Sequence, residues 1–318
     1  MSTTQISEEM YWKYPTERVV GCFYGMQPGL IVRDPDTFKN FKVLNRVEKE
    51  MLALVDELLR QRNYKSTGRN DFIDLLLECK KKGVITGDSI EYMNQDGSAK
   101  KATVDLTYSL IAAQLFIFFA AGFETTCSST SITLHELAHH PEVQKKVQEE
   151  IDRVLKRYNN KLCYEAIKEM TYLEWTFKEG MRIFPSLGFL IRQCTRRYTF
   201  NDLDLTIDKG VKIIIPLQAM QNNPKYFDNP SEFCPERFDP KNIENGSKFV
   251  YLPFGAGPRA CIGERMALLQ SLAGLAVVLS RFSVHPVPEA PRKPFVDPRS
   301  NIVQVIRKGL PLTFTVRK

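Results

Sequence analysis

The stretch from Phe254 to Gly263 is a glycine-punctuated loop that contains a cysteine. It reads Phe-Gly-Ala-Gly-Pro-Arg-Ala-Cys-Ile-Gly, and a helix-like segment follows it at once. Gly255 and Gly257 take positive φ at little cost, so we expect the loop to fold back and aim backbone N–H groups at the Cys261 sulfur. A position just before a helix N-terminus, with Arg259 two residues earlier, favours the thiolate. Such a thiolate is a soft metal ligand.

Composition places the chain among globular proteins. Its 318 residues are 43% hydrophobic and 25% charged, which is enough for one large core or two small ones. The seven cysteines are scattered, odd in number and without a CxxC pair, which argues against a disulfide framework or a zinc ribbon and favours a reducing compartment. The net charge of +7 is mild, so it gives little support to nucleic-acid binding. It leaves open attraction to an acidic protein or an anionic membrane face.

The loop resembles the haem-ligand signature of the cytochrome P-450 family. Its pattern, Phe-x-x-Gly-x-Arg-x-Cys-x-Gly, is filled by Phe254, Gly257, Arg259, Cys261 and Gly263. The resemblance implies that Cys261 is the axial thiolate of haem b, iron protoporphyrin IX, with Arg259 on a haem propionate. It also implies that Gly263 lets the next helix approach the porphyrin. The alternative is a buried structural cysteine in a Gly/Pro turn.

A second motif lies at residues 121–126, Ala-Gly-Phe-Glu-Thr-Thr. Gly122 weakens a helix and threonine hydroxyls bond back to carbonyls four residues earlier, so we expect a bulge or bend with room for dioxygen. The motif resembles the element that crosses the distal haem face in the same family. The resemblance implies that Ala121 lies at the haem and that Thr125 and Glu124 deliver protons. Alone, these residues are more often structural.

Glu179 and Arg182 are three residues apart and are neighbours on one helix face. An isolated pair of this kind is usually a surface ion pair of little value. The resemblance adds Arg237 and implies a structural triad that locks an irregular segment to the core. It also places Arg192 where the family has a second propionate ligand on a strand. The alternative for Arg192 is a strand-edge side chain that faces water.

Three other patterns give no site. His135 and His139 share a helix face, but nothing there completes a metal ligand set, so solvation at a helix end is the better interpretation. The run from Ser128 to Ser131 lies in a helix and not in a Gly-x-Ser-x-Gly elbow, which does not support a serine hydrolase. Neither Trp12 nor Trp175 has arginine four residues later, so the Trp-x-x-x-Arg propionate clamp of full family members is missing.

Periodicity and breakers predict a mainly α protein with a minor β region, an α+β class. The predicted elements are a β-hairpin over 14–24 and 29–35, helices opening at 35, over 43–60, 103–139, 141–158, 171–183 and 263–282, a helical lead-in at 68–79, a charged connector at 81–101, short strands within 189–215, an irregular segment at 222–257 and a strand at 312–316. The charged stripe on the helix over 141–158 (Glu142, Lys145, Lys146, Glu149 and Glu150) predicts a solvated surface.

The chain is about a third shorter than a full-length member of the cytochrome P-450 family. We therefore expect a cytochrome P-450 fold that lacks the segment between the first sheet with its early helix and the run-up to the long central helix. The predicted parts are residues 1–41, with the hairpin and early helix, residues 42–102, a helical connector after an apparent internal deletion, and residues 103–318, the haem-binding core. We expect apolar surface at residues 115–119 to be exposed as a result.

The resemblance implies a haem-thiolate monooxygenase, most like insect microsomal enzymes that metabolise xenobiotics. Such an enzyme inserts one oxygen atom from O2 into a small lipophilic substrate, with electrons from NADPH through a reductase. The alternative is a truncated, inactive relative that is a haem-binding scaffold or an unstable fragment. The family implies the endoplasmic reticulum membrane, and the alternative is a cytoplasmic or peripheral location. The first dozen residues are polar and predict no signal peptide or anchor, and the apolar run at 109–123 is shorter than the roughly 20 residues of a spanning helix, which predicts a core helix.

Overall fold

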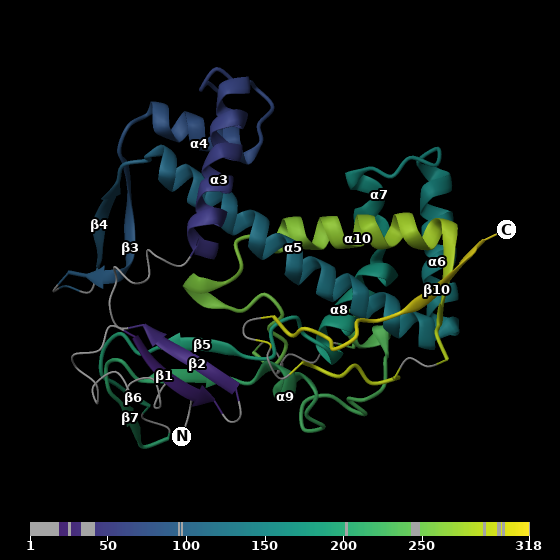
Figure 1. Cartoon of the computed structure of the whole chain (residues 1–318). Helices are drawn as coiled ribbons and strands as arrows, with labels where there is room; N and C mark the ends of the chain where they lie inside the picture. Colours follow the sequence, from purple (N-terminus) through teal and green to yellow (C-terminus); the bar gives the residue numbers. More distant parts are fainter. Residues whose placement is uncertain are drawn as a thin grey trace. The chain divides into compact units, whose positions relative to one another are not determined.

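The computed structural model describes residues 19–24, 27–32, 42–94, 96, 98–200, 203–242, 249–288, 291–297, 300 and 303–317. Close to half of these residues are helical, and small sheets accompany the helices, so the predicted α+β class is confirmed (Figure 1). The helices are α3 (Lys42–Gln61), α4 (Phe72–Lys81), α5 (Tyr108–His139), α6 (Pro141–Arg157), α7 (Tyr164–Glu169), α8 (Thr171–Ile183), α9 (Leu217–Gln221) and α10 (Glu264–Arg281), with 3-10 turns η1 (Pro235–Phe238) and η2 (Gly257–Arg259).

The strands pair in antiparallel twos. They are β1 (Val19–Tyr24) with β2 (Gln27–Val32), β3 (Ile85–Met93) with β4 (Ala99–Val104), β5 (Leu190–Gln193) with β8 (Lys212–Ile215), β6 (Tyr198–Phe200) with β7 (Leu205–Ile207), and β9 (Phe282–Pro286) with β10 (Leu312–Val316). The predicted hairpin is confirmed, with Val19 opposite Val32. The helix predicted to open at residue 35 lies outside the described residues.

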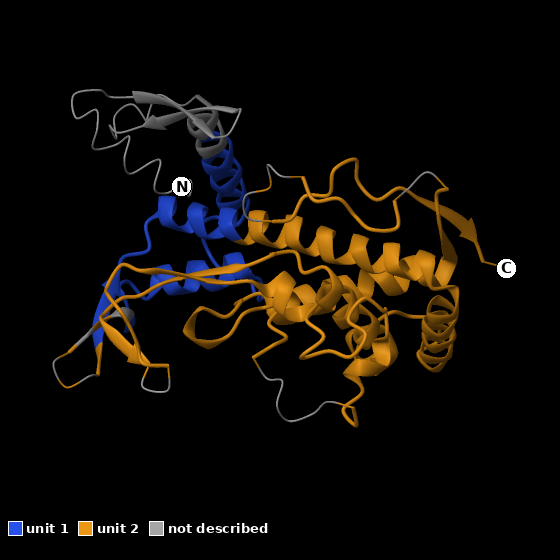
Figure 2. Ribbon diagram, turned by 90° about the horizontal axis from the view of Figure 1, so that it is seen from below, with its two compact units in different colours: residues 1–89, 100–117 blue, residues 90–99, 118–318 orange. Residues whose placement is uncertain are grey.

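The chain divides into two compact units, which Figure 2 colours separately. Unit 1 comprises residues 1–89 and 100–117, and unit 2 comprises residues 90–99 and 118–318. The three parts expected from the sequence stay a prediction.

Unit 1 has a small core between α3, α4 and the first turns of α5. The buried residues are Val55, Leu59, Leu76, Leu77, Leu106, Ile111 and Ala112. Asp71 caps α4 by accepting a hydrogen bond from the Asp74 N–H, and the Arg62 guanidinium donates to both carboxylates. The hydrogen bond from Arg62 holds the pKa of Asp71 well below its usual range. Ion pairs thus fix the turn between α3 and α4.

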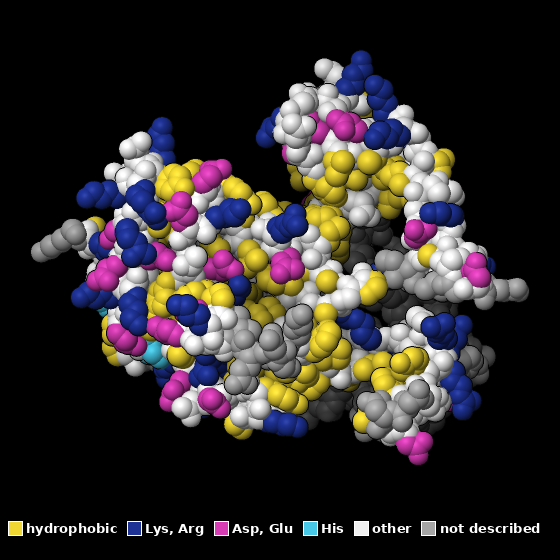
Figure 3. Space-filling view, turned by 180° about the vertical axis from the view of Figure 1, so that it is seen from behind, with side chains coloured by type: hydrophobic (Ala, Val, Ile, Leu, Met, Phe, Trp, Pro, Cys, Tyr) yellow, Lys and Arg dark blue, Asp and Glu magenta, His cyan; other side chains and the backbone are white. Residues whose placement is uncertain are grey.

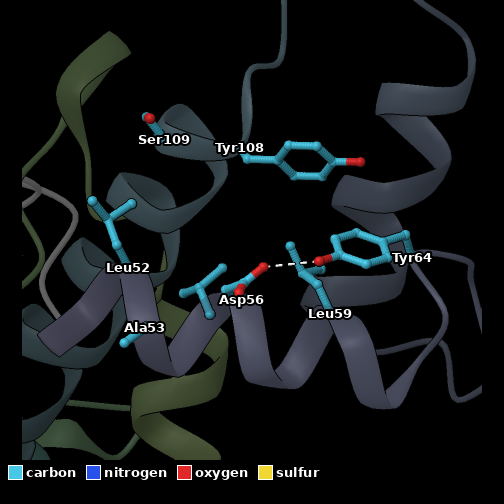
Figure 4. A pocket seen from close by; sticks show the side chains of 8 residues that line it. Leu52, Ala53, Asp56, Leu59, Tyr64, Tyr108 and Ser109 are labelled. Carbon is cyan, nitrogen blue, oxygen red and sulfur yellow. Dashed lines mark hydrogen bonds between the residues drawn. The ribbon is translucent and has the colours of Figure 1, made fainter. Parts of the chain in front are cut away.

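A cavity of about 600 Å³ opens in unit 1 beside α3 (Figure 4). Leucine and valine side chains of α3 line one side, and Tyr108 and Ser109 of α5 line another. The Tyr64 hydroxyl donates to Asp56 at 2.8 Å, and the Tyr64 ring meets the Tyr108 ring edge-on at 5.6 Å. None of the site residues predicted from the sequence lines this cavity.

Unit 2 has the larger core, between the C-terminal part of α5 and helices α6, α7, α8 and α10. On α6, Val143, Val147, Ile151 and Val154 recur at helical spacing and are buried, which explains why this helix packs by one face. The prediction of a solvated stripe on α6 is wrong for one of its members, Glu150. Glu150 is buried, because its carboxylate accepts hydrogen bonds from the Tyr172 and Leu173 N–H groups in the first turn of α8, at 3.0 and 2.9 Å.

The central helix α5 differs from its prediction in two ways. It begins at Tyr108 and not at residue 103, because residues 99–104 pair with β3 as a strand. It is also helical without interruption through Gly122, although the Thr125 hydroxyl does bond back to the Ala121 carbonyl at 2.6 Å. A back-bonding threonine is compatible with an intact helix, so the expected bulge is not seen at this motif, and the expected bend stays a prediction.

Among the described residues α5 is long and apolar enough to cross a membrane by length and composition, and 17% of its most apolar window is buried. The apolar run at 109–123 therefore understates its length. Within residues 109–123 only Ile111 and Ala112 are buried, so the prediction that this run is a core helix is not confirmed, although the far end of α5 contributes Leu137 and Ala138 to the unit 2 core. As expected from the sequence, Phe116, Ile117, Phe118 and Phe119 are exposed. Figure 3 shows apolar side chains reaching the surface in several patches among charged ones.

The prediction that His135 is solvated at a helix end is wrong. His135 is 1% exposed, and its Nε2 lies 3.0 Å from the Arg292 carbonyl. Since a carbonyl only accepts, Nε2 carries the proton. Glu136, also buried, binds Arg292 through two hydrogen bonds of 2.9 and 2.7 Å. The segment around Arg292 therefore covers this end of α5. Within the described residues no group of three or more metal-binding side chains is present.

Candidate functional site

The loop before α10 folds back on itself as its glycines predict. Gly255 and Gly257 have φ of +71° and +75°, a conformation that favours glycine. The Cys261 N–H donates to the Phe254 carbonyl at 2.8 Å, which closes the loop, and α10 begins three residues after the cysteine, at Glu264. Among the described residues no N–H donates to the Cys261 sulfur, so the predicted cradle of N–H groups around it is not seen.

The Cys261 side chain is exposed, in contrast to the buried structural cysteine that was the alternative. Its sulfur lies 3.8 Å from where a Cβ on Gly263 would stand. Ile262 beside it is 87% exposed. A soft, accessible sulfur ligand therefore lies just before α10, beside an exposed isoleucine.

Arg192 lies near this loop, although it precedes Gly255 by 63 positions in the sequence. It is on β5, opposite Ile213 of β8, and its side chain is half-buried. A Cβ on Gly255 would stand 3.7 Å from its Nη2 atom. Arg192 therefore lies near the loop, and its role as a propionate ligand stays a prediction beside the alternative of a strand-edge arginine. Arg259 lies within the same loop, in η2, and is exposed.

The predicted distal residues lie together on α5. Ala121 and Glu124 are exposed, and Thr125 is half-buried with its hydroxyl on the Ala121 carbonyl. Phe123 between them is 65% exposed. Among the described residues no hydrogen bond joins Thr125 or Glu124 to the Cys261 loop. The structure thus forms two separate groups of predicted site residues, each with an exposed apolar neighbour.

The three residues of the predicted triad are in contact. Arg182 donates to both oxygens of Glu179, at 2.7 and 2.8 Å, and both side chains are fully buried. Arg182 also donates to the carbonyls of Gln221, Pro230 and Glu232. Gln221 is the last residue of α9, and Pro230 and Glu232 belong to the irregular segment after it, so one guanidinium fastens both α9 and that segment to α8.

Arg237 reaches the same carboxylate from η1. Its Nε lies 3.4 Å from the Glu179 Oε1 atom, which also accepts from the Cys234 N–H at 3.0 Å. The Arg237 Nε is buried and makes no hydrogen bond of good geometry, while its Nη2 donates to the Asn229 carbonyl. Arg237 therefore binds the Glu179 carboxylate less closely than Arg182 does.

The residues present fit the haem that the resemblance implies. Cys261 offers an exposed thiolate-forming ligand, and Arg192 and Arg259 bring two cations to the same loop, where carboxylates would be bound. Exposed apolar side chains on both elements, Ile262 at the loop and Phe123 on α5, suit a flat apolar macrocycle. The sulfur ligand, the two arginines and the exposed apolar side chains are thus all compatible with a bound haem.

Two contributors at the site were not predicted. Gln221 is fully buried, accepts from the Leu252 N–H at 3.1 Å and donates to the Met181 and Arg182 carbonyls, so it ties the approach to the Cys261 loop to α8. Ser186 donates to the Thr125 carbonyl at 3.1 Å. Neither residue stands in a motif, and a polar residue beside Asn or Pro is ordinary in a turn, so the sequence held no signal for them.

Comparison with known proteins gives consistent matches. The family profile described as Cytochrome P450 matches residues 18–312. Cytochrome P450 6B6 of Helicoverpa armigera is 35% identical over 283 residues, which are 87% of this chain and 53% of that protein. Probable cytochrome P450 6a20 of Drosophila melanogaster is 38% identical over 245 residues, 76% of this chain and 46% of that protein. For cytochrome P450 6B1 of Papilio polyxenes the identity is 38% over 240 residues, 76% and 47%. The chain spans about half the length of these curated relatives.

Proposed function

Because the chain belongs to the cytochrome P450 family, we propose that it forms the haem-binding part of a haem-thiolate monooxygenase. The reaction would insert one oxygen atom from O2 into a small lipophilic substrate, with electrons from NADPH through a reductase. The proximity of the Arg192 guanidinium to Gly255 carries the proposal, because it brings a cation from a distant strand to the loop of the sulfur ligand.

Each site residue has a distinct task in this proposal. Cys261 would bind the haem iron, and Arg192 and Arg259 would hold the propionates. When bound, the haem supplies the chemistry that activates dioxygen. Thr125 would hold a proton at its hydroxyl, which in this structure donates a hydrogen bond to the Ala121 carbonyl. The exposed Glu124 would exchange protons with solvent. Glu179, Arg182 and Arg237 would keep the loop and its support in place.

The family also suggests where the protein works and with what. We propose attachment to the endoplasmic reticulum membrane and docking of a reductase near the face that carries Cys261. A cationic reductase-docking face would agree with the net charge of +7.

A second candidate function is a haem-binding scaffold without turnover, the inactive relative weighed from the sequence. The observation in its favour is the exposure of Phe119 and Phe123 on α5, at 67% and 65%. An active site that excludes water needs such surface covered.

The absorption spectrum of the reduced, carbon-monoxide-bound protein tests the proposal. We expect a strongly red-shifted Soret band for the wild type and its loss in Cys261→Ser. Ser128→Ala, on α5, is the matched control and should keep the band. A colourless wild type after expression with ample haem, or an unaltered spectrum in Cys261→Ser, would overturn the proposal. Substrate turnover with added reductase then separates the monooxygenase from the scaffold.

A further inference from the structure

Ser186 lies two residues after the C-cap of α8 and inserts its hydroxyl between two residues of α5. Its Oγ donates to the Thr125 carbonyl at 3.1 Å and lies 2.8 Å from the Ser129 Oγ. A hydroxyl has a single proton, so Ser129 must be the donor in the second bond. The two bonds therefore run in one direction, from Ser129 through Ser186 to the Thr125 carbonyl.

The hydroxyl side chains of α5 show why Ser129 is the link. Thr125, Ser129 and Thr133 are four residues apart and share one face of the helix. The Thr125 and Thr133 hydroxyls bond back to carbonyls of their own helix, at 2.6 and 2.9 Å. Ser129, 7% exposed, turns outward to Ser186 instead. This face of α5 thus meets the segment after α8 through a hydroxyl pair.

Ser186 is itself held from a third segment. The Gln304 N–H donates to the Ser186 carbonyl at 2.8 Å, and the Gln304 side-chain amide donates to the Pro185 carbonyl at 2.8 Å. That amide also reaches Gln218 of α9 at 3.1 Å. The hydroxyl that contacts α5 is therefore mounted on a backbone fixed by bonds that do not involve α5.

The turn of α5 at Thr125 needs such a support. Residues 121–124 are all exposed, so side-chain packing contributes little there, and Gly122 lowers the helix propensity. A helix carbonyl has a second lone pair beyond its bond to the N–H four residues later. Ser186 uses that lone pair at Thr125.

We propose that Ser186 is a positioning residue that fixes the Thr125 turn of α5 by donating to the Thr125 carbonyl. The catalytic consequence rests on the proposed function: a Thr125 held in place delivers protons to the oxygen chemistry, and a displaced one lets two electrons and two protons reduce O2 to H2O2 with no insertion.

Amide hydrogen exchange of the full chain, with or without haem, tests the support directly. In Ser186→Ala, exchange in the peptide around residues 121–129 should be faster by roughly two- to tenfold, the factor that one hydrogen bond contributes. Ser186→Thr keeps the hydroxyl and should restore the wild-type rate. Ser131→Ala, an exposed serine on the same helix, is the matched control and should change nothing. Wild-type exchange in Ser186→Ala would overturn the proposal.

The consequence for chemistry is tested on haem-loaded protein with reductase and NADPH. Ser186→Ala should release more H2O2 per NADPH than wild type, with an unchanged carbon-monoxide spectrum and with rescue by Ser186→Thr. In a Thr125→Ala background the same substitution should add nothing, because its effect passes through Thr125. Fully additive release would contradict that route. A wild-type protein that binds no haem would overturn the proposed function. The amide hydrogen exchange measurement would still decide whether Ser186 holds the Thr125 turn.

Discussion

Arg182 and Glu179 form two parallel hydrogen bonds, and neither side chain has any exposed surface. The remaining donors of Arg182 go to three backbone carbonyls of the segment that leads to the Cys261 loop. A planar guanidinium makes all of these bonds at once, which an ammonium does not. The pair therefore joins the helix α8 to the support of the site.

Arg182→Ala should destabilise the fold and prevent haem incorporation. The substitution leaves the Glu179 charge buried without its bidentate partner, which costs about 3–5 kcal/mol of unfolding free energy. Urea unfolding and the haem absorbance of the purified protein measure the two effects. Arg197→Ala is the control, since Arg197 and Asp208 form an exposed pair at 3.6 Å. Normal haem content in Arg182→Ala would contradict the structural role.

Gly180→Ala should weaken the packing of α8 on α5. A Cβ at Gly180 would stand 2.6 Å from the Thr133 Oγ1 atom, so either the Thr133 side chain or one of the two helices must move. We expect a loss of about 1–3 kcal/mol in unfolding free energy, as for other overpacked sites. Gly274→Ala on α10 is the matched control, because a Cβ there meets nothing within 4 Å, and it should stabilise by about 0.5–1 kcal/mol. Equal effects at the two glycines would refute the close contact.

Glu150→Ala should destabilise the start of α8. The carboxylate accepts from two N–H groups of the first turn, and hydrogen bonds to a charged group contribute about 1.5–3 kcal/mol. Glu149→Ala, one residue earlier and exposed, should change the unfolding free energy by less than about 0.5 kcal/mol. Denaturant unfolding of both variants checks the difference, and a larger effect at Glu149 would reverse the assignment.

The stability of the chain should fall in mild acid because of His139. Burial, with the nearby His135, lowers its pKa in the folded state from 6.5. Below that value the unfolded chain takes up a proton that the folded chain does not, so the unfolding free energy decreases as pH falls toward the folded pKa. The slope is at most about 1.4 kcal/mol per pH unit for one proton.

Urea unfolding between about pH 7.5 and 5.5, the range over which a free histidine titrates, measures this slope. His139→Asn should flatten it. His285→Asn, exposed on β9, should leave it as in the wild type. An unchanged slope in His139→Asn would assign the acid sensitivity to another group.

Elements with strong local signals were predictable. Proline at the start of α6 and after α8 marks their limits, and the observed helices, 141–157 and 171–183, follow those signals within a residue. The left-handed conformations of Gly255 and Gly257 were likewise expected from the loop alone. In each case the physical cause lies within a few residues of the effect.

Contacts between distant segments were not predictable in the same way. Glu150 stands in a charged pattern typical of a solvated face, and only the arrival of α8, more than 20 residues later, buries it. His135 was expected in solvent because nothing near it in sequence announces Arg292, 157 residues away. The contact of Ser186 with Thr125 is of the same kind, since a lone serine after proline has no signature.

The open position of the Cys261 sulfur also governs how the protein must be handled. Cys127 on α5 is exposed as well, so among the side chains that the structure describes these two thiols meet solvent and the thiols of neighbouring molecules. In air without reductant such thiols oxidise to sulfenic acids and intermolecular disulfides, and a ligand consumed in that way binds no iron. A non-reducing gel run beside every spectrum would show how much of a low haem content is due to disulfides formed during storage.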